Sequence, residues 1–213
     1  MQVSVSFLKG LDDMETRAKK INKSCADFIH VDQMDGIFVN NTTILPSDVK
    51  NWVGKNSKPL EVHLMCEEPE KYFLEYKELN TSLIYVHYEI KTDINEVLNK
   101  LDELEIKKGL AINPETDINT IKPLLSKVDS ILVMSVKPGL GGQKFMNSAL
   151  TKIRELKKLR TYLNLNYDIN VDGGINDVTA KLCSEAGVNR VVSGAYICEN
   201  ENLNEFIEKI KRA

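Results

Sequence analysis

The chain has 213 residues, a length that suits one domain with a sizeable hydrophobic core or two small domains. Its 28 basic and 31 acidic residues give a formal net charge of −3, which argues against nucleic acid as the main partner. We expect no membrane partner and no secretory signal, because no apolar run approaches the ~18 residues of a membrane span and the N-terminus does not resemble a leader.

Hydrophobic periodicity divides the chain into strands and helices that alternate from one end to the other. In the first half, the predicted strands cover residues 3–8, 27–32, 59–65 and 82–87. The predicted helices there are 12–23, one opened by Pro46 and Ser47, one beginning at Pro69, and 93–104.

The same alternation continues in the second half of the chain. The predicted strands are 108–112, 130–136, 167–172 and 189–193. The predicted helices are 117–125, 148–163, 177–186 and 204–211. Glycine or proline closes most of the strands, as expected where a chain must turn into the next helix.

Eight strand-helix units joined by short loops predict a parallel sheet. Eight units favour a closed (β/α)8 TIM barrel, and 213 residues lies near the lower size limit of that fold. No composition break interrupts the alternation, so we predict a single domain over residues 1–213. An open doubly wound sheet is the alternative, but no Gly-x-Gly-x-x-Gly follows the first strand.

Four cysteines, none of them in a Cys-x-x-Cys pair, point to a reducing cytoplasm and free thiols. We predict that each is a small buried hydrophobic residue. They are Cys25, Cys66, Cys183 and Cys198.

One apolar strand ends in a histidine and an aspartate. His30 and Asp32 are two residues apart, so they project to the same side of that strand. The other two histidines, His63 and His87, fall late in the third and fourth strands, and Asp172 ends the seventh. In a barrel, all of these residues lie at the carboxyl ends of the strands, where barrel enzymes carry their active sites.

Two of these histidines and the two aspartates make a credible site for one divalent metal ion. Imidazole together with carboxylate suits Zn, Fe, Mn or Co. A site of this kind can serve catalysis by expanding its coordination to admit substrate oxygens. The alternative is a metal-free site in which His30 and Asp32 simply hydrogen-bond within the barrel mouth.

Glycines gather after the last three strands. They are Gly139, Gly141 and Gly142 after the sixth, Gly173 and Gly174 after the seventh, and Gly194 after the eighth. Glycine lets backbone amides approach an anion, and the loops after strands seven and eight form the usual phosphate site of TIM barrels. Three such loops on one side of the barrel favour a phosphate site over simple turns.

Three methionines lie in or just beyond the strands that carry these polar groups. Met34, Met65 and Met134 are interpreted as core residues or, if they line the pocket together with His87, as an apolar floor that excludes water. Both interpretations remain open at this point.

Several motifs together resemble the ribulose-phosphate 3-epimerase family. They occur in order between Ser6 and Gly194, so they cover nearly the whole chain. The motifs are HVDQMDGIFV at 30–39, VHLM at 62–65, NPET at 113–116, VMSVKPGLGGQKF at 133–145 and VDGGI at 171–175. The resemblance implies a TIM barrel of the ribulose-phosphate-binding type.

The resemblance also implies a reaction, the interconversion of D-ribulose 5-phosphate and D-xylulose 5-phosphate in the pentose phosphate pathway. The implied metal ligands are His30, Asp32, His63 and Asp172. Asp32 and Asp172 would be the acid-base pair, transferring protons on opposite faces of the substrate through an enediolate. The implied substrate-binding residues are Ser6, His63, Gly141, Gly142, Gly173, Gly174, Gly194 and Ala195. The implied partner is a small phosphorylated ketose, and the implied assembly is a homo-oligomer, either a dimer or a hexamer.

The sequence departs from the family pattern at Leu140, where an aromatic residue is usual, and at Ala195, where serine is frequent. The nearest alternative function is a 3-epimerase for a ketohexose phosphate such as D-allulose 6-phosphate. Glu115 in the NPET motif leaves that alternative open. A sugar-phosphate-binding barrel without catalysis is a second alternative, but such a protein would be expected to lose Asp32 or Asp172.

Overall fold

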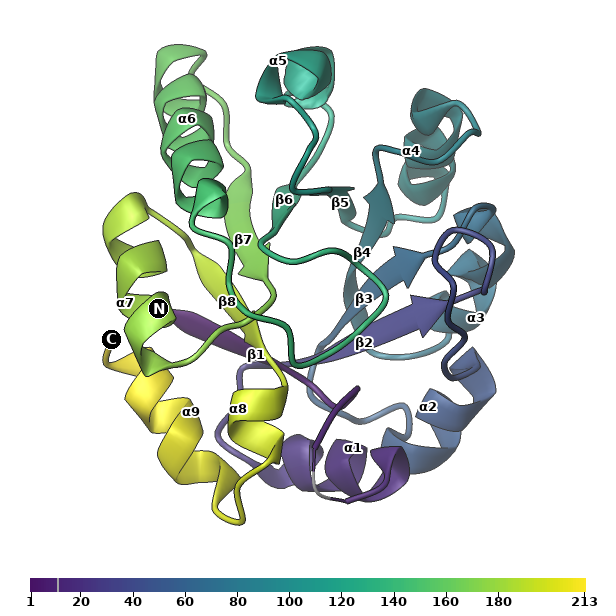
Figure 1. The fold of residues 1–213 in the computed structure, drawn as a ribbon. Helices are drawn as coiled ribbons and strands as arrows, with labels where there is room; N and C mark the ends of the chain where they lie inside the picture. Colours follow the sequence, from purple (N-terminus) through teal and green to yellow (C-terminus); the bar gives the residue numbers. More distant parts are fainter. Residues whose placement is uncertain (11) are drawn as a thin grey trace.

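The computed structural model describes residues 1–10 and 12–213. Eight parallel strands close into a barrel in the order of the sequence, and the helices surround it (Figure 1). The strands are β1 Gln2–Ser6, β2 Phe28–Met34, β3 Leu60–Met65, β4 Thr81–His87, β5 Lys108–Ile112, β6 Ser130–Met134, β7 Asp168–Asp172 and β8 Arg190–Ser193. The (β/α)8 prediction is therefore confirmed, and the open sheet is excluded.

The helices follow the predicted alternation. They are α1 Met14–Lys23, α2 Pro46–Val53, α3 Phe73–Lys77, α4 Ile94–Glu103, α5 Ile118–Ile121, α6 Ser148–Tyr162, α7 Asp177–Ala186, α8 Ala195–Cys198 and α9 Leu203–Lys211, with 3-10 turns η1 Pro69–Tyr72 and η2 Lys122–Leu124. Three details differ from the prediction, and one is that the helix expected over 117–125 is divided between α5 and the η2 turn. The helix expected to begin at Pro69 starts with the η1 turn, and the short α8 was not predicted.

The first strand ends earlier than the sequence predicted, and a buried arginine explains why. The Arg17 guanidinium donates from Nε to the carbonyl of Phe7 at 2.7 Å and from Nη2 to the carbonyl of Leu8 at 3.1 Å. These carbonyls bond to a side chain instead of to a neighbouring strand. The chain consequently leaves the sheet after Ser6, whose hydroxyl faces the site described below.

The hydrophobic core has two parts. The larger part fills the space between the barrel and its helices, where Val, Ile and Leu predominate. A smaller cluster lies inside the barrel, formed by Leu83, Tyr85, Ala111, Leu132, Met134, Val136 and Val192. This packed interior closes the barrel from below, so a ligand can enter only at the mouth.

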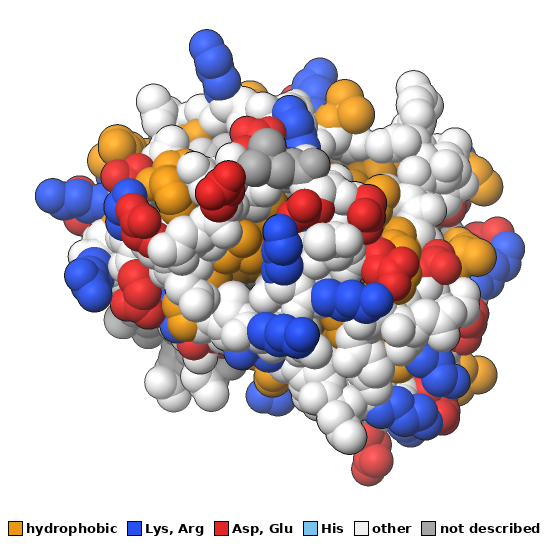
Figure 2. All heavy atoms as spheres, turned by 90° about the horizontal axis from the view of Figure 1, so that it is seen from below, with side chains coloured by type: hydrophobic (Ala, Val, Ile, Leu, Met, Phe, Trp, Pro, Cys, Tyr) orange, Lys and Arg blue, Asp and Glu red, His pale blue; other side chains and the backbone are white. Residues whose placement is uncertain are grey.

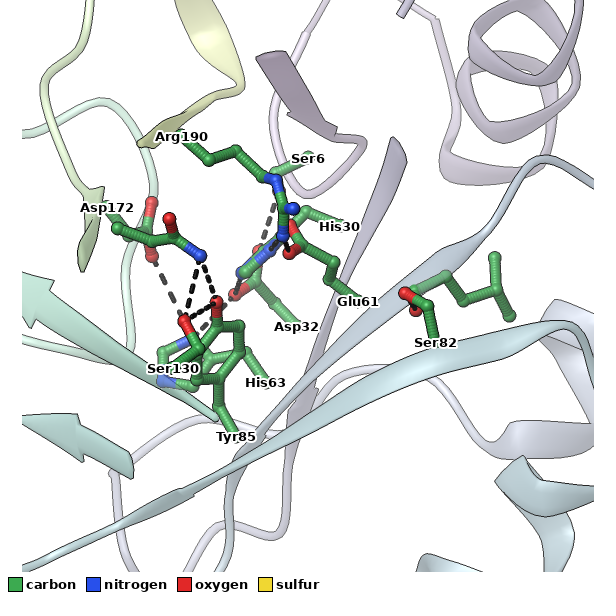
Figure 3. A network of polar contacts seen from close by, with 12 residues as sticks. Ser6, His30, Asp32, Glu61, His63, Ser82, Tyr85, Ser130, Asp172 and Arg190 are labelled. Carbon is green, nitrogen blue, oxygen red and sulfur yellow. Dashed lines mark hydrogen bonds and ion pairs between the residues drawn. The ribbon is translucent and has the colours of Figure 1, made fainter. Parts of the chain in front are cut away.

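Below the site, a buried ion pair crosses the barrel interior. Arg190 on β8 is bonded to Glu61 on β3, and its guanidinium carbon lies 3.8 Å from the centre of the Phe28 ring. Both charged groups are almost completely buried, and each therefore needs the other. The pair links β3 to β8, and Oε2 of Glu61 lies 3.9 Å from Nδ1 of His30 (Figure 3).

All four cysteines are free; Cys66, Cys183 and Cys198 are buried as predicted, whereas Cys25 is only partly buried beside Asn204, so that prediction was wrong for Cys25. Basic and acidic side chains are interspersed on the face seen in Figure 2. In the described part of the chain, no helix has both the length and the hydropathy that crossing a membrane requires.

Candidate active site and metal centre

A cavity of about 420 Å³ opens at the carboxyl ends of the strands. The loop between β6 and α6 passes across the mouth of the barrel in Figure 1 and forms one wall of this cavity. Ser6, Asp32 and Asp172 line the cavity, as do the three methionines Met34, Met65 and Met134. The methionines thus form the apolar floor that was one of the two interpretations of the sequence.

Strand register brings four potential metal ligands together. Asp32 on β2 is the neighbour of His63 on β3, and His30 lies one alternation below Asp32 on the same side of its strand. Asp172 reaches the same point from β7 (Figure 3). One donor atom from each of these four residues lies within 4.8 Å of the others. The four residues selected from the sequence therefore converge.

Two aspartate contacts define the centre of the cluster. Nδ1 of His63 lies 3.2 Å from Oδ1 of Asp32 and 3.8 Å from Oδ2 of Asp172. The other oxygen of Asp32 accepts a 2.6 Å hydrogen bond from the Ser6 hydroxyl. The Asp32 carboxylate is thereby fixed in one orientation, with one oxygen left to face the cluster.

His30 fits the role of a metal ligand because its buried ring nitrogens have no other partner among the described residues. The ring is fully buried, and neither ring nitrogen has a hydrogen-bond partner among residues 1–10 and 12–213. Its Nε2 lies 3.5 Å from Asp32, and its Nδ1 lies 3.9 Å from Glu61. Buried polar atoms without partners are costly, so an ion bound at this point would satisfy an otherwise unmet requirement.

The electrostatics around His30 favour a positive charge. Burial lowers the pKa of His30, but the nearby carboxylates, Asp32 first and then Glu61 and Asp172, together outweigh this effect and raise the pKa to about 10. Two buried carboxylates thus attract a cation to the position of His30. A proton provides that charge in the metal-free chain, and a divalent ion held by the four ligands would provide it equally well.

The pKa values of the two aspartates are shifted in opposite directions. Burial raises the pKa of Asp32, but its contacts with His30 and His63 outweigh burial and hold the pKa far below its usual range. At Asp172, burial and then the negative charge of Asp32 raise the pKa to about 7. Near neutral pH, Asp32 is therefore a carboxylate, while Asp172 keeps its proton in a large fraction of molecules.

The sequence predicted that His87 lines the pocket, but His87 is not among the residues that line the cavity. It is fully buried behind His63, and its Nε2 lies 2.8 Å from Nε2 of His63. Its Nδ1 lies 3.0 Å from Oε2 of Glu89. Burial lowers the pKa of His87 to about 4, so this ring is neutral. The pocket-lining prediction was wrong because His87 ends β4, whose interior position is covered by the neighbouring His63.

The predicted glycines lie on one side of the cavity. Gly141, Gly142, Gly173, Gly174 and Gly194 all line it, and so does Ala195 at the start of α8. Gly174 adopts φ +61°, and a Cβ there would lie 2.3 Å from the backbone nitrogen of Phe145. Only glycine permits this close approach between the loop after β7 and the loop after β6.

Three lysines beside the glycines were missed by sequence reasoning. Lys9, Lys137 and Lys144 line the same cavity. The ammonium of Lys9 lies so close to Gly142 that an added Cβ would be 2.5 Å from it. Lys137 and Lys144 stand within the glycine motif and could have been noticed there. Lys9 is distant in sequence, and only the closure of the barrel brings it to this loop.

Comparison with protein families identifies the group that this sequence resembles. A sequence model described as the ribulose-phosphate 3 epimerase family matches residues 2–198. The chain is 37% identical over 194 residues to the ribulose-phosphate 3-epimerase of Bacillus subtilis (strain 168), covering 91% of this chain and 89% of that protein. It is 38% identical over 212 residues to the ribulose-phosphate 3-epimerase of Helicobacter pylori (strain J99), covering 99% and 97%.

Solved structures resemble the fold at much lower sequence identity. A mutant tryptophan synthase alpha-subunit from Pyrococcus furiosus superposes with a TM-score of 0.70 at 15% identity, covering 100% of this chain and 98% of that one. The 3-hexulose-6-phosphate synthase from Salmonella typhimurium gives a TM-score of 0.66 at 17% identity, covering 100% and 97%. These similarities support the barrel fold alone.

Proposed function

The chain belongs to the ribulose-phosphate 3-epimerase family, and from that premise we propose that it interconverts D-ribulose 5-phosphate and D-xylulose 5-phosphate. The family assignment makes the chain an isomerase that acts on carbohydrates. The observation that supports this reaction best is the pair of carboxyl groups that line the cavity, Asp32 and Asp172, whose pKa values are displaced in opposite directions.

Epimerisation at C3 requires a proton to leave one face of the substrate and another to arrive on the opposite face. Asp32 comes from β2 and Asp172 from β7, so the two groups approach the cavity from different walls of the barrel. In one direction, the Asp32 carboxylate removes the C3 proton and the Asp172 carboxyl group delivers one to the other face. In the reverse direction, the two groups exchange roles.

Ser6 and the methionines support this proton transfer. The Ser6 hydroxyl holds one oxygen of Asp32, so that the other remains directed at the reacting centre. Met34, Met65 and Met134 form the floor of the cavity, and each is 2% exposed. An apolar floor limits the access of water to the enediolate formed when the proton leaves, so that protonation by the aspartates is favoured.

His30, Asp32, His63 and Asp172 would hold one divalent metal ion, Zn, Fe, Mn or Co. When bound, such an ion supplies positive charge beside the oxygens that become negative as the C3 proton leaves. The unpartnered nitrogens of His30 support this assignment, as does the attraction that Asp32 and Glu61 exert on a cation.

The glycine side of the cavity is proposed to bind the phosphate group. Backbone amides of Gly141, Gly142, Gly174 and Gly194 can approach an anion without interference from a Cβ. Lys9 and its two neighbouring lysines add positive charge at the same wall. The phosphate would anchor the sugar at a fixed distance from the two aspartates, which is the positioning that proton transfer needs.

The proposed partner is thus a small phosphorylated ketose, with neither nucleic acid nor a membrane as a ligand. We propose a cytoplasmic location, consistent with four free thiols. A homo-oligomer, a dimer or a hexamer, is proposed from the family resemblance alone. Light scattering on the purified chain tests that assembly, and a monomer at all concentrations would contradict it.

The substrate proposal is tested by a coupled assay that compares D-ribulose 5-phosphate with D-allulose 6-phosphate. The hexose is included because Leu140 lines the cavity at 67% exposure where the family usually has an aromatic residue. We expect kcat/KM to be higher for the pentose by at least an order of magnitude. A preference for the hexose would replace the substrate assignment, and no turnover of either sugar would support a binding role without catalysis.

A further inference from the structure

The wall behind His63 holds buried polar groups that the proposed proton transfer does not use. His87 and Glu89 lie there, and neither is among the residues that line the cavity. Glu89 follows β4, and its side chain is 22% exposed. The NPET motif, residues 113–116, adjoins this carboxylate. These groups form a continuous chain of hydrogen bonds from His63 to the loop between β5 and α5.

The contact between the two histidines restricts where their protons can be. Two ring nitrogens that lie 2.8 Å apart share one proton, so one ring donates and the other accepts. If His87 donates, its Nδ1 is bare and its lone pair faces the Glu89 carboxylate at 3.0 Å, which is repulsive. If His63 donates, the proton of His87 sits on Nδ1 and bonds to Glu89. In the metal-loaded chain, where a bound ion would replace the 3.2 Å contact between Nδ1 of His63 and the Asp32 carboxylate, Glu89 therefore selects the second arrangement.

That selection has a consequence on the other side of the His63 ring. A neutral imidazole carries one proton, so a proton on Nε2 leaves Nδ1 with a free lone pair. This is the nitrogen that lies 3.2 Å from Asp32 and 3.8 Å from Asp172, at the centre of the ligand cluster. We infer that His87 and Glu89 are positioning residues, which hold His63 in the one tautomer able to bind a metal ion through Nδ1. This inference rests on the proposed metal-dependent function.

The NPET motif orients the carboxylate that makes this selection. Oε1 of Glu89 accepts a hydrogen bond from the backbone nitrogen of Asn113 at 2.8 Å and another from the hydroxyl of Thr116. Lys152 on α6 donates to the backbone carbonyls of Asn113 and Thr116, which ties the motif to that helix. With Oε1 occupied, Oε2 is left to face His87. A loop outside the cavity thus controls the tautomer of His63, a proposed metal ligand.

The first test is nuclear magnetic resonance of the unaltered, 15N-histidine-labelled chain loaded with Zn²⁺. The sequence has only three histidines, so their ring nitrogens can be assigned without crowding. We expect the proton of His63 on Nε2 and the proton of His87 on Nδ1. A proton on Nδ1 of His63, or on Nε2 of His87, would overturn the inference. The measurement needs neither substrate nor a folded variant, so an inactive enzyme could still pass it.

The second test measures Co²⁺ affinity and the visible spectrum of the bound ion in three variants. His87→Phe keeps a ring against Phe38, whose centroid is 4.6 Å away, but removes the acceptor, and we expect about 10- to 100-fold weaker binding with a changed spectrum. His87→Gln restores an acceptor and should recover part of that loss. Thr116→Val removes one bond to Glu89 and should have a smaller effect in the same direction.

Thr120→Val is the matched control for the threonine variant. Its hydroxyl bonds to the carbonyl of Asp117 on the surface and touches no member of the chain of bonds, so Co²⁺ affinity should stay within twofold of the wild type. Binding by His87→Phe within twofold of the wild type, with an unchanged spectrum, would overturn the inference. If the tautomers and the Co²⁺ affinities are as expected but the chain shows no epimerase activity, only the substrate assignment is rejected.

Discussion

The two walls of the cavity that carry the aspartates are built differently. On the β2 wall, Asp32 is held by the Ser6 hydroxyl and lies beside the rings of His30 and His63, and it is ionised at neutral pH. On the β7 wall, Asp172 is 17% exposed and precedes Gly173 and Gly174, which both adopt positive φ, and its pKa is raised to about 7. The same side-chain chemistry is therefore prepared as a proton acceptor on one wall and as a proton donor on the other.

The difference follows from what surrounds each carboxyl group. Positive or donating neighbours stabilise the charged form of Asp32, and its charge then disfavours a second charge on Asp172 nearby. One aspartate thus sets the protonation of the other. In a pair arranged in this way, one carboxyl group can accept a proton while the other donates one, without a change of the fold. A reversible epimerisation requires this.

Metal removal should produce the largest effect because both walls are proposed to share the ion. Chelation should abolish activity, and added Zn²⁺, Mn²⁺ or Co²⁺ should restore it. It should also lower the free energy of unfolding, by about 2.7 kcal/mol relative to a sample with metal at 100 times its dissociation constant. Turnover and thermal unfolding are followed in parallel. Full activity in a sample verified to be free of metal would contradict the shared site.

Asp172→Asn changes only the carboxyl group on the β7 wall. It removes the proton donor while preserving size, so turnover should fall by about 10²- to 10⁴-fold. Asp168→Asn, at the other end of the same strand, is the matched control and should leave turnover within a few-fold of the wild type. Steady-state kinetics and metal content are measured for both variants. Turnover near that of the wild type in Asp172→Asn would refute the two-base scheme.

Ser6→Ala weakens the β2 wall without removing its carboxylate. The lost 2.6 Å hydrogen bond is made to a charged group, worth about 1.5–3 kcal/mol, so kcat/KM should fall by roughly 10- to 100-fold. The acidic limb of the pH–rate profile should also move to higher pH, because Asp32 loses a donor that favours its charged form. Ser4→Ala, a buried hydroxyl two residues earlier on β1, should change neither quantity.

The smallest expected effect concerns the glycines on the proposed phosphate side of the cavity. Gly174→Ala should raise KM several-fold and destabilise the fold, because its Cβ would meet the Phe145 backbone at 2.3 Å. Gly54 adopts a similar φ of +72° but has nothing within 4 Å of an added Cβ. Gly54→Ala should therefore cost only the backbone strain of its φ +72°, ψ 178° conformation, about 1–3 kcal/mol, with KM unchanged. Equal costs in the two variants would show that the contact with Phe145 is unimportant.

The fold was predictable because hydrophobic periodicity indicates the strands and helices, and glycine and proline indicate the turns between them. Each predicted strand-helix unit is present, and residues 108–112 and 177–186 were placed without error. The first strand was overextended because Phe7 and Leu8 are apolar, and the sequence does not reveal that Arg17 captures their carbonyls. The short α8 was missed because four residues are too few to display a helical period.

The site was predictable where residue type and strand position were sufficient. His30, Asp32, His63 and Asp172 converge because parallel strands end at one rim. His87 looked equivalent to His63 in sequence, yet it lies behind that ring, since depth within a barrel depends on register and packing. Lys9 and Glu89 carried no signal, because their importance comes only from neighbours that are distant in the chain.

Hydrogen exchange at C3 in D₂O, followed separately for each pentose 5-phosphate epimer, tests the division between the two walls most directly. Asp172→Asn should retain exchange of the epimer whose proton Asp32 removes and lose exchange of the other. Asp32→Asn should show the opposite pattern, provided that both variants still contain metal. Exchange of both epimers by either variant, or the same pattern in the two variants, would contradict the assignment of one face to each aspartate.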